Sequence, residues 1–439
     1  MPETTPPSAA QLRRTSWLRW SSYALLIVAY MLGYFHRMAP AVLSGELQAA
    51  FQTSGAALGI LAAAYFYSYT AMQIPAGVLA DTWGARRIVA LGTLLAGLGA
   101  LIFGLAETLW LAGFGRFLVG MGVSVIFIAI LKFTAHWFFD HQFATVTGMT
   151  IMLGNVGALS AATPLSWALE VASWRGIMLA LAGVSLLSAA LIWLVVRDRP
   201  GDAGLPSMRA LEGKPEHSAI VGGWRQGLMT VLKNPATWPG FFTSLGLGGI
   251  FFTLAGLWGV PFLRDVQGLD RIGAAHHATA LILGFAFGSL AIGLISDWLG
   301  KRKPVFFAFV LCFAVCWAPV QLTIALPFWA SLTQFFLLGF FATAYTISLS
   351  ATKEVNPPAL SGMATGVVNT GTFLGVAIMQ PVIGHVMDLG WDGRLAEGGV
   401  RLYSAANYQL GFIAMSVFLV ISVVFATRLR ETHCRNIYS

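Results

Sequence analysis

The sequence alternates long apolar stretches with short polar ones from residue 20 almost to its end. A helix that crosses the hydrocarbon core of a membrane needs about 20 apolar residues. Twelve stretches reach that length, and they begin near residues 20, 57, 87, 109, 143, 174, 237, 275, 304, 328, 361 and 406. The pattern therefore predicts an all-α integral membrane protein with twelve transmembrane helices.

Composition agrees with this prediction and excludes a water-soluble chain. Of the 439 residues, 57% are hydrophobic and 10% are charged, and the mean hydropathy is +0.74; polar groups could not cover such a surface. The net charge of +8 does not indicate nucleic acid as a partner, because the basic residues form no patch with interleaved aromatics. The three cysteines give neither a disulfide framework nor a zinc spacing. We expect no metal, no cofactor and no enzymatic activity.

Lysine and arginine are concentrated in alternate loops. Eighteen of the 26 basic residues fall in the two tails and in the loops on the same side of the membrane as the tails. Five fall in the loops on the other side, and three lie within or near spans. Short loops rich in Lys and Arg stay in the cytoplasm. We therefore expect a monomeric, multi-pass protein of the cell inner (plasma) membrane, with both termini cytoplasmic.

One long polar stretch divides the chain after the sixth span. It begins at Arg197 and is rich in charge, glycine and proline, which argues against a folded domain. We therefore predict a cytoplasmic tail (1–19), a six-helix bundle (20–196), a cytoplasmic linker (197–235), a second six-helix bundle (236–427) and a second cytoplasmic tail (428–439).

Two short loops carry the same motif, one in each half. Residues 73–87 read Gln-Ile-Pro-Ala-Gly-Val-Leu-Ala-Asp-Thr-Trp-Gly-Ala-Arg-Arg, and residues 293–303 read Gly-Leu-Ile-Ser-Asp-Trp-Leu-Gly-Lys-Arg-Lys. Their acids, Asp81 and Asp297, are 216 residues apart, which is close to half of the chain. The openings of the fifth and eleventh spans also match, at a spacing of 218 residues. The two halves are therefore repeats of one six-span unit.

The order glycine, acid, glycine and basic residues resembles the signature loop of the major facilitator superfamily. This resemblance implies two pseudo-symmetric six-helix bundles around a central cavity, transport by alternating access, and two loops that act as gates. The matching residues are Gly77, Asp81, Gly84, Arg86 and Arg87 in the first half and Asp297, Lys301 and Arg302 in the second. Thr82 and Trp298 stand where many members carry a further basic residue.

Ionisable side chains within spans are the first candidates for function, because burying them in a bilayer is costly. In the first span Tyr30, Tyr34 and Arg37 recur at i, i+4 and i+7 and share one helix face. A guanidinium at this place can clamp a carboxylate or a phosphate with its planar fork of donors. The alternative is that Arg37 extends to the outer headgroups of the bilayer.

Two further cations lie in or near the fourth span. Lys132 is either a second cation of the cavity or an anchor at the inner interface of the membrane. Arg116, followed four residues later by Gly120, resembles the fourth-span motif of the family, which implies a role in structure or proton coupling. An anchor at the outer end of the span is the alternative. No Asp or Glu falls in the middle of a span, so proton coupling through a carboxylate lacks an obvious carrier.

Other polar side chains in the spans should face the cavity rather than lipid. The expected substrate-binding residues are Tyr30, Tyr34, Arg37, Tyr65, Tyr69, Lys132, Asn155, Trp258, Tyr345, Asn369 and Gln380. Glycines four residues apart should let helices pack closely. These pairs are Gly284 with Gly288, Gly362 with Gly366, and Gly371 with Gly375.

Residues 34–41, Tyr-Phe-His-Arg-Met-Ala-Pro-Ala, resemble the first span of the organophosphate:phosphate antiporters and the anion:cation symporters, where an arginine contacts the anionic group of the substrate. Three positions depart from the antiporters. The seventh span has no arginine, Gln73 replaces a lysine, and Gly154 replaces a histidine. One strong cation suits a monoanion better than a dianionic phosphate. We therefore expect a secondary transporter of a small organic anion or zwitterion of the carboxylate type, with a proton or sodium ion as candidate coupling ion.

Two other classes remain as alternatives. A proton-coupled drug or cation efflux antiporter of the same superfamily typically carries Gly-Pro-x-x-Gly-Gly in its fifth span, where this chain reads Gly-Asn-Val-Gly-Ala-Leu-Ser from residue 154. A non-transporting membrane receptor or an enzyme would be expected to show a large soluble domain or a catalytic motif. The sequence shows neither of these features.

Overall fold

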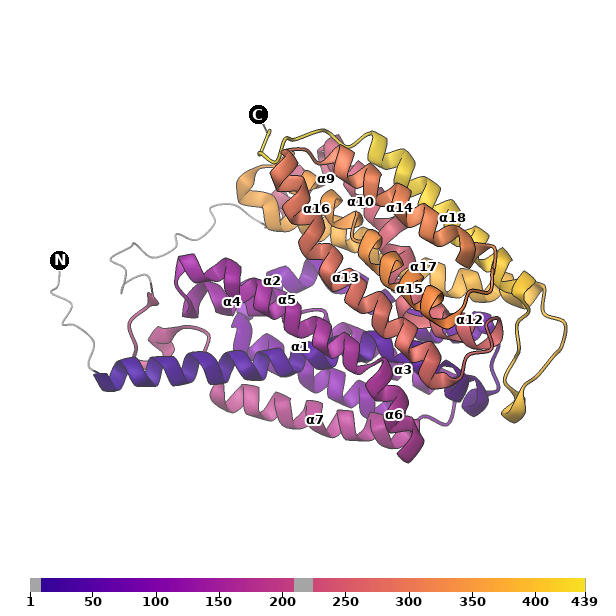
Figure 1. The fold of residues 1–439 in the computed structure, drawn as a ribbon. Helices are drawn as coiled ribbons and strands as arrows, with labels where there is room; N and C mark the ends of the chain where they lie inside the picture. The colour runs from indigo at the N-terminus through magenta and orange to yellow at the C-terminus, as the bar shows by residue number, and fades with distance from the viewer. Residues whose placement is uncertain (1–8, 209–223, 439) are drawn as a thin grey trace.

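The structure is a computed structural model, and it describes residues 9–208 and 224–438. Nearly all regular structure in these two ranges is helical, and a single β-bridge there pairs Leu395 with Arg401. The first half of the chain forms one group of helices and the second half forms another, and the two groups lie side by side (Figure 1). The predicted arrangement of two six-helix bundles is confirmed.

The first bundle contains two spans that are broken in the middle. Its helices are α1 (Ala9–Phe51), α2 (Gly55–Leu105), α3 (Leu109–Val123), α4 (Ile126–Trp137), α5 (Phe143–Ser160), α6 (Thr163–Val171) and α7 (Trp174–Val195), with the short helix η1 (Asp140–Gln142) before α5. The fourth span consists of α3 and α4, and the fifth consists of α5 and α6. Pro164 lies in the first turn of α6, where its missing N–H costs no hydrogen bond.

Helix α2 holds two spans. Its 51 residues would reach about 77 Å as a straight helix, which is more than twice the ~30 Å core of a bilayer. The helix turns at Gly84, whose φ of 80° is accessible to glycine and strained for other residues. The Asp198 carboxylate fills the space beside Gly84 and accepts a hydrogen bond from the backbone N–H of Arg86 at 2.8 Å. The signature loop of the first half is this turn.

The second bundle begins with a seventh span that is interrupted by two π-helical turns. This span consists of α10 (Trp238–Thr243), η4 (Ser244–Gly248), α11 (Gly249–Thr253), η5 (Leu254–Trp258) and α12 (Gly259–Asp265). The later helices are α13 (Arg271–Leu299), α14 (Lys303–Gln321), α15 (Phe328–Ala342), α16 (Tyr345–Glu354), η6 (Pro358–Leu360), α17 (Ser361–Leu389), η7 (Glu397–Gly399) and α18 (Ala405–Thr427). The tenth span consists of α15 and α16.

The described parts of the predicted linker form short helices. They are η2 (Pro200–Ala203), α9 (Trp224–Lys233) and η3 (Pro235–Thr237). Residues 209–223 of that linker lie outside the described residues. Helix α9 packs through Val231 against Ala364 and Val367 of α17, so this end of the linker is attached to the second bundle.

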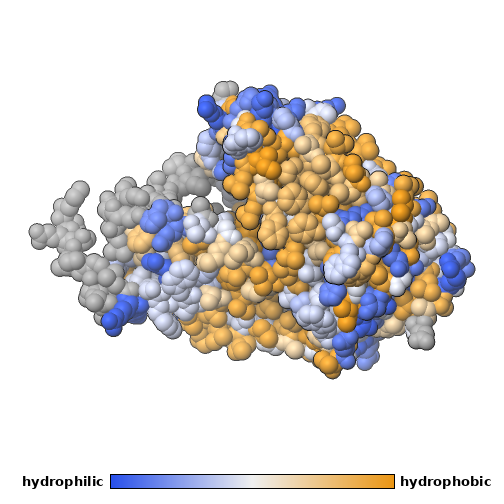
Figure 2. All heavy atoms as spheres, in the orientation of Figure 1, coloured by the Kyte–Doolittle hydropathy of each residue, from blue (hydrophilic) through white to orange (hydrophobic). Residues whose placement is uncertain are grey.

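Eleven helices in the described ranges are long and apolar enough to cross a membrane. The remaining crossing is the part of α2 that precedes Gly84, which brings the number of spans to the predicted twelve. Large apolar side chains such as Trp110, Leu294 and Trp298 are exposed on these helices. Figure 2 shows apolar residues over the middle of one face and hydrophilic residues toward its ends. The surface is therefore that of a membrane protein.

Glycines allow several pairs of spans to approach closely. A Cβ added at Gly284 would lie 1.9 Å from a carbonyl oxygen of α15, and one at Gly375 would lie 2.1 Å from the Leu245 oxygen. The pairs that pack as expected are Gly284 with Gly288 and Gly371 with Gly375. At Gly362 and Gly366 an added Cβ would meet nothing within 4 Å. The third expected pair therefore does not pack in this structure.

Helices α2 and α17 run antiparallel along the boundary between the bundles, and their backbones touch at one end. A Cβ added at Gly59 would lie 2.4 Å from the Gln380 carbonyl oxygen. A Cβ added at Gly384 would lie 2.1 Å from the Gly55 oxygen. These distances leave room for glycine alone, so the bundles are closed against each other here. We call this the opposite end, because it lies away from the end of the boundary at which α18 stops.

The other end of the same boundary is open. An added Cβ would meet nothing within 4 Å at Gly77 of α2 or at Gly366 of α17. This end also carries the turn at Gly84 and the chain that follows α18, so we call it the terminus end. The two helices therefore form a wedge that is closed at the opposite end.

Candidate substrate site

Arg37 of α1 lies between the two bundles. Its side chain is buried, with 5% of its surface exposed, and its Nε donates to the Tyr65 hydroxyl at 3.4 Å. No ion pair found among the described residues includes Arg37. A contact with lipid headgroups, the alternative raised by the sequence, does not fit a side chain buried against both bundles.

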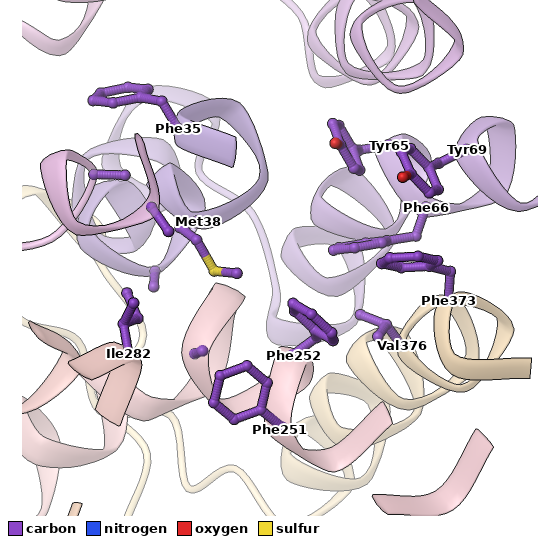
Figure 3. Packing of buried hydrophobic residues seen from close by; sticks show 14 of the residues in the cluster. Phe35, Met38, Tyr65, Phe66, Tyr69, Phe251, Phe252, Ile282, Phe373 and Val376 are labelled. Carbon is purple, nitrogen blue, oxygen red and sulfur yellow. The ribbon is translucent and has the colours of Figure 1, made fainter. Parts of the chain in front are cut away.

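Aromatic rings surround the Arg37 guanidinium. Its Cζ atom lies 4.6 Å from the centroid of Tyr34, 4.9 Å from Tyr69 and 4.9 Å from Phe373. The rings of Phe252 and Tyr65 follow at 5.8 and 5.9 Å. Tyr65, Tyr69, Phe252 and Phe373 are close together in Figure 3, on helices of both bundles. Both bundles therefore contribute to the surroundings of one cation.

The stripe read from the first span lies on one face of α1. The Tyr30 hydroxyl donates to the Tyr34 hydroxyl at 3.3 Å, and the two rings meet edge to face. Tyr30 also stacks on Phe127 of α4 at 5.5 Å. A Cβ added at Gly154 of α5 would lie 2.6 Å from the Tyr30 ring. Glycine at this position therefore makes room for Tyr30.

One of the other expected residues bridges the bundles near Arg37. The Asn369 side chain of α17 donates to the Gln73 amide oxygen of α2 at 3.0 Å. This hydrogen bond lies one helical turn from the contact between Tyr69 and Phe373, on the terminus side. Tyr345 stacks on Phe285 at 6.0 Å.

Other expected residues make no recorded contact with the Arg37 guanidinium among the described residues. The Trp258 indole donates to the Gln380 carbonyl oxygen at 3.0 Å, toward the opposite end. The Gln380 amide is buried, and neither of its polar atoms has a partner among the described residues. Asn155 is half-buried on α5.

Lys132 is not placed beside Arg37. Its ammonium donates to the Ala80 carbonyl at 2.9 Å, next to the signature loop of the first half. Ala80 follows Tyr69 by eleven residues of α2, which is about 16 Å along a helix. Lys132 therefore contacts the backbone next to the signature loop, at the terminus end of the first bundle.

Arg116 is buried and ties three helices together. Its guanidinium donates to the carbonyl oxygens of His36 at 2.5 Å and Ala62 at 3.3 Å. The same group lies 5.3 Å from the Tyr65 ring. A side chain that is 3% exposed is not an anchor at the membrane surface. The contacts fit the structural role that the family motif implies.

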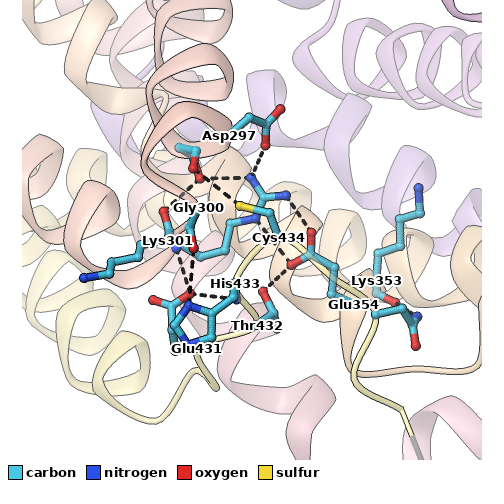
Figure 4. A network of polar contacts seen from close by, with 12 residues as sticks. Asp297, Gly300, Lys301, Lys353, Glu354, Glu431, Thr432, His433 and Cys434 are labelled. Carbon is cyan, nitrogen blue, oxygen red and sulfur yellow. Dashed lines mark hydrogen bonds and ion pairs between the residues drawn. The ribbon is translucent and has the colours of Figure 1, made fainter.

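The signature loop of the second half is held within its own bundle (Figure 4). Arg302 forms ion pairs with Asp297 at 2.9 Å and with Glu354 at 2.6 Å. The Glu431 carboxylate, in the chain after α18, accepts from the backbone N–H groups of Arg302 and Lys303 at 2.8 and 2.9 Å. Burial alone would lower the pKa of the Arg302 guanidinium, but its bonds to Glu354 outweigh this effect and raise the pKa.

The loop of the first half shows related contacts. Arg86 donates from Nε to the Trp193 carbonyl at 2.8 Å and stacks over the Trp193 ring. Arg87 and Lys301 of the two loops are exposed. The side chain of Asp81 lies outside what the structure describes. The described contacts of both loops stay inside their own bundles.

The opposite end carries a carboxylate that the sequence did not single out. Asp388 of α17 accepts hydrogen bonds from the backbone N–H groups of Gly55 at 3.0 Å and Ala56 at 2.8 Å, which begin α2. It also accepts from the Tyr403 hydroxyl at 2.5 Å and pairs with Arg401 at 3.1 Å. The second bundle therefore caps a helix of the first bundle.

A second polar contact closes the same end. Glu46 of α1 forms an ion pair with Arg271, the first residue of α13, at 2.7 Å. Both of these contacts must break before the opposite end can open.

Two helical bundles with a buried cation at their boundary are typical of a membrane transport protein. The sequence model of the Major Facilitator Superfamily matches residues 25–378 and again 260–435. The chain therefore belongs to this superfamily, and it is a transporter rather than an enzyme.

Its relatives include proteins named for anionic compounds. The chain is 25% identical to the membrane sensor protein UhpC of Escherichia coli (strain K12), over 85% of this chain and 88% of that one. It is 23% identical to a probable hexose phosphate transport protein of Chlamydia pneumoniae, over 84% and 85%. It is 21% identical to the probable sulfoacetate transporter SauU of Cupriavidus necator (strain ATCC 17699), over 83% and 86%.

The fold is similar to that of solved transporters. A bacterial homolog of the human lysosomal transporter Spinster, in an inward-facing and unoccupied conformation, superposes with a TM-score of 0.72. The alignment covers 94% of this chain and 97% of that chain at 17% identity. At this identity the likeness supports the fold alone.

Proposed function

We propose that this transporter moves a small organic anion or zwitterion of the carboxylate type, and that Arg37 binds the anionic group. The observation that carries the proposal is a buried guanidinium between the bundles without an acid to neutralise it among the described residues. Aromatic faces attract a cation by about 0.5–2 kcal/mol each. That attraction offsets only part of the cost of burying a charge. A substrate anion supplies the missing opposite charge.

The charge at the site favours a monoanion. Arg116 is bound to backbone carbonyls, and Lys132 of α4 is bound to Ala80, which is about 16 Å from Tyr69 along α2. A dianionic phosphate would face Arg37 alone. Sulfoacetate and hexose phosphates, for which two of the relatives are named, are both dianions, so the preference for a monoanion rests on the charges of this chain and not on those names.

The wider site and the gates belong to the same proposal. The proposed substrate-binding set is the one expected from the sequence without Lys132, which contacts Ala80 at the terminus end, and the gating loops are those around Asp81 and Asp297. With the domain boundaries predicted above and both termini in the cytoplasm, the wedge would open to the cytoplasm. The signature loops would then latch the bundles together when the terminus end closes, with a proton or a sodium ion as the coupling ion.

The test is binding and uptake by variants at Arg37. Arg37→Lys keeps the charge but loses the fork of donors, so binding should weaken by about 1–3 kcal/mol, the scale of a charge-assisted hydrogen bond. Arg37→Gln should abolish carboxylate uptake into proteoliposomes. Ligand-induced thermal stabilisation of the purified protein measures binding separately, because a ligand that binds the folded state raises its stability.

A matched control is Arg175→Gln. Arg175 is also an arginine over an aromatic ring, 4.5 Å from Trp174, and it donates to the carbonyls of Gly104 and Ala106. It does not contact Arg37, so carboxylate binding should persist. Undiminished uptake by Arg37→Gln, or a set of ligands made up only of cations and neutral drugs, would support efflux of drugs or cations instead. Binding without uptake by the native protein would indicate a sensor.

A further inference from the structure

The rings around Arg37 belong to a longer chain of aromatic contacts. On one side Tyr34 meets Tyr30, which stacks on Phe127 of α4. On the other side Phe373 contacts Phe252 of α11, whose ring meets Phe285 of α13. Phe285 in turn stacks on Tyr345 of α16. Seven helices contribute rings to this chain, which we call the aromatic band.

The ring geometries vary along the aromatic band. Tyr69 and Phe373 meet at 62° with centroids 4.5 Å apart, and this pair lies directly beside the guanidinium. Phe66 and Phe373 are stacked at 6.1 Å. Figure 3 shows Phe373 between the side chains of α2 and Phe252. Aromatic rings of both bundles therefore surround Arg37.

Some of the hydrogen-bonding groups next to Arg37 are bonded to each other. Gln73 and Asn369 bond across the boundary, and the hydroxyls of Tyr30 and Tyr34 share a bond. The Tyr65 hydroxyl accepts from Arg37 and donates to the Gly33 carbonyl at 3.5 Å. For the guanidinium itself, the bond to Tyr65 is the one recorded among the described residues. The remaining N–H groups of Arg37 are charged donors that an anion can use.

The surroundings of Arg37 distinguish between ligands that carry the same anionic group on different carbon skeletons. A sugar acid or a hexose phosphate has a hydroxyl on nearly every carbon, and each hydroxyl buried without a partner weakens binding. A flat aromatic ring has no hydroxyl groups that need a hydrogen-bond partner. It buries apolar surface and can meet other rings edge to face or offset. Two parallel N–H groups of an arginine match the two oxygens of one carboxylate.

We propose that the site takes an aromatic monocarboxylate, with the carboxylate on Arg37 and the ring within the aromatic band. This inference rests on the function proposed above and narrows it to one substrate class. Tyr69 and Phe373, which flank the guanidinium from different bundles, hold the ring of the ligand. Hexose phosphates and uronic acids should bind more weakly at the same position.

The experiment compares equilibrium binding of purified full-length protein to five probes. They are benzoate, phenylacetate, cyclohexanecarboxylate, galacturonate and glucose 6-phosphate. At least one of the two aromatic acids should bind ten-fold or more tightly than galacturonate, and more tightly than cyclohexanecarboxylate, which has the same charge and nearly the same size. Glucose 6-phosphate should bind most weakly.

Variants test whether the rings of the aromatic band cause the preference for aromatic acids. Phe373→Leu should reduce the ratio of aromatic to cyclohexane acid affinity several-fold, and Phe313→Leu should leave it unchanged. Phe313 is a buried phenylalanine that stacks on Trp317 rather than contacting Arg37. A ratio of two affinities measured on one sample does not depend on the fraction of folded protein, so loss of folding does not imitate the effect.

The outcomes separate this inference from the proposed function. Tighter binding of galacturonate than of both aromatic acids, abolished by Arg37→Gln, would retain the carboxylate site and overturn the aromatic preference. Equal binding of benzoate, phenylacetate and cyclohexanecarboxylate would also overturn it, and so would a ratio that Phe373→Leu leaves unchanged. Carboxylate binding that survives Arg37→Gln would overturn both proposals.

Discussion

The two ends of the boundary between α2 and α17 differ sharply, although the same two helices form both. At the opposite end the backbones touch at Gly59 and Gly384, and Asp388 caps the first residues of α2. At the terminus end Gly77 and Gly366 face open space. The described contacts of the signature loops there remain within single bundles. The closed end is held by contacts between bundles and the open end by contacts within them.

This difference shows which interactions oppose each conformational change. Opening the opposite end must break Asp388 from α2 and Glu46 from Arg271. Closing the terminus end needs no break in the described network around Arg302. A ligand shifts such an equilibrium only by its difference in affinity between the two states. Variants at each end should therefore act differently.

The largest effect is expected from Gly59→Leu. Its Cβ would lie 2.4 Å from the Gln380 carbonyl oxygen and 2.7 Å from the Pro381 Cα, and backbone atoms cannot move aside as a flexible side chain can. The opposite end should be forced apart and transport lost. The distance between spin labels on Leu105→Cys and Leu389→Cys, both exposed at this end, should increase.

Gly366→Leu is the matched control on the other helix. Nothing lies within 4 Å of its Cβ, so the larger side chain should be accommodated and the spin-label distance at the opposite end should stay unchanged. A decrease in folded protein with Gly366→Leu, equal to that with Gly59→Leu, would contradict the wedge.

Asp388→Asn should have the second largest effect. The variant keeps the shape but loses the charge that binds two backbone N–H groups and Arg401. Hydrogen bonds to charged groups contribute about 1.5–3 kcal/mol, so the population with an open opposite end should rise about 10- to 100-fold. The same spin-label pair measures this shift.

Asp392→Asn, four residues later in the loop that follows α17, provides the control. Asp392 pairs with Arg394, and both side chains are largely exposed. Exposed ion pairs contribute about 0–1 kcal/mol. The distance distribution should therefore not change. Equal effects of the two substitutions would show that net charge, rather than the cap on α2, holds this end.

The smallest effect is expected from Glu431→Gln at the terminus end. Burial alone would raise the pKa of Glu431, but the backbone N–H groups of Arg302, Lys303 and His433 outweigh it and lower the pKa below its ordinary value of 4.5. The carboxylate therefore stabilises the fold above pH 4.5, and this contribution is lost as the pH falls through the lowered pKa. Losing a cap on α14 should cost about 1 kcal/mol.

Thermal unfolding between pH 7 and pH 3 checks this prediction. The native protein and Glu431→Gln should differ near neutral pH and converge in the most acidic samples. Glu107→Gln, at an exposed position outside the helices, should follow the native curve throughout. A change in the spin-label distance at the opposite end with Glu431→Gln would mean that this contact also couples the bundles.

The sequence by itself determined the spans, because their length and apolarity are local properties. Predicted starts at 143, 174 and 328 coincide with the first residues of α5, α7 and α15. The turn at Gly84 follows from a glycine placed among polar residues. The stripe of Tyr30, Tyr34 and Arg37 follows from the helical period. The repeat of 216 residues indicated two similar bundles, because a repeat can be seen in the order of the residues along the chain.

The tertiary structure alone decided which faces meet. Phe252 and Phe373 contact Arg37 from the second bundle. The chain has 31 phenylalanines, and nothing in the sequence distinguishes these two from the rest. Asp388 caps Gly55 across 333 residues of chain. A helical period fixes which side chains share a face, but it does not fix the partner of that face. Alternating access requires one sequence to support two relative placements of the bundles, and contacts such as Asp388 with α2 can exist in only one of them.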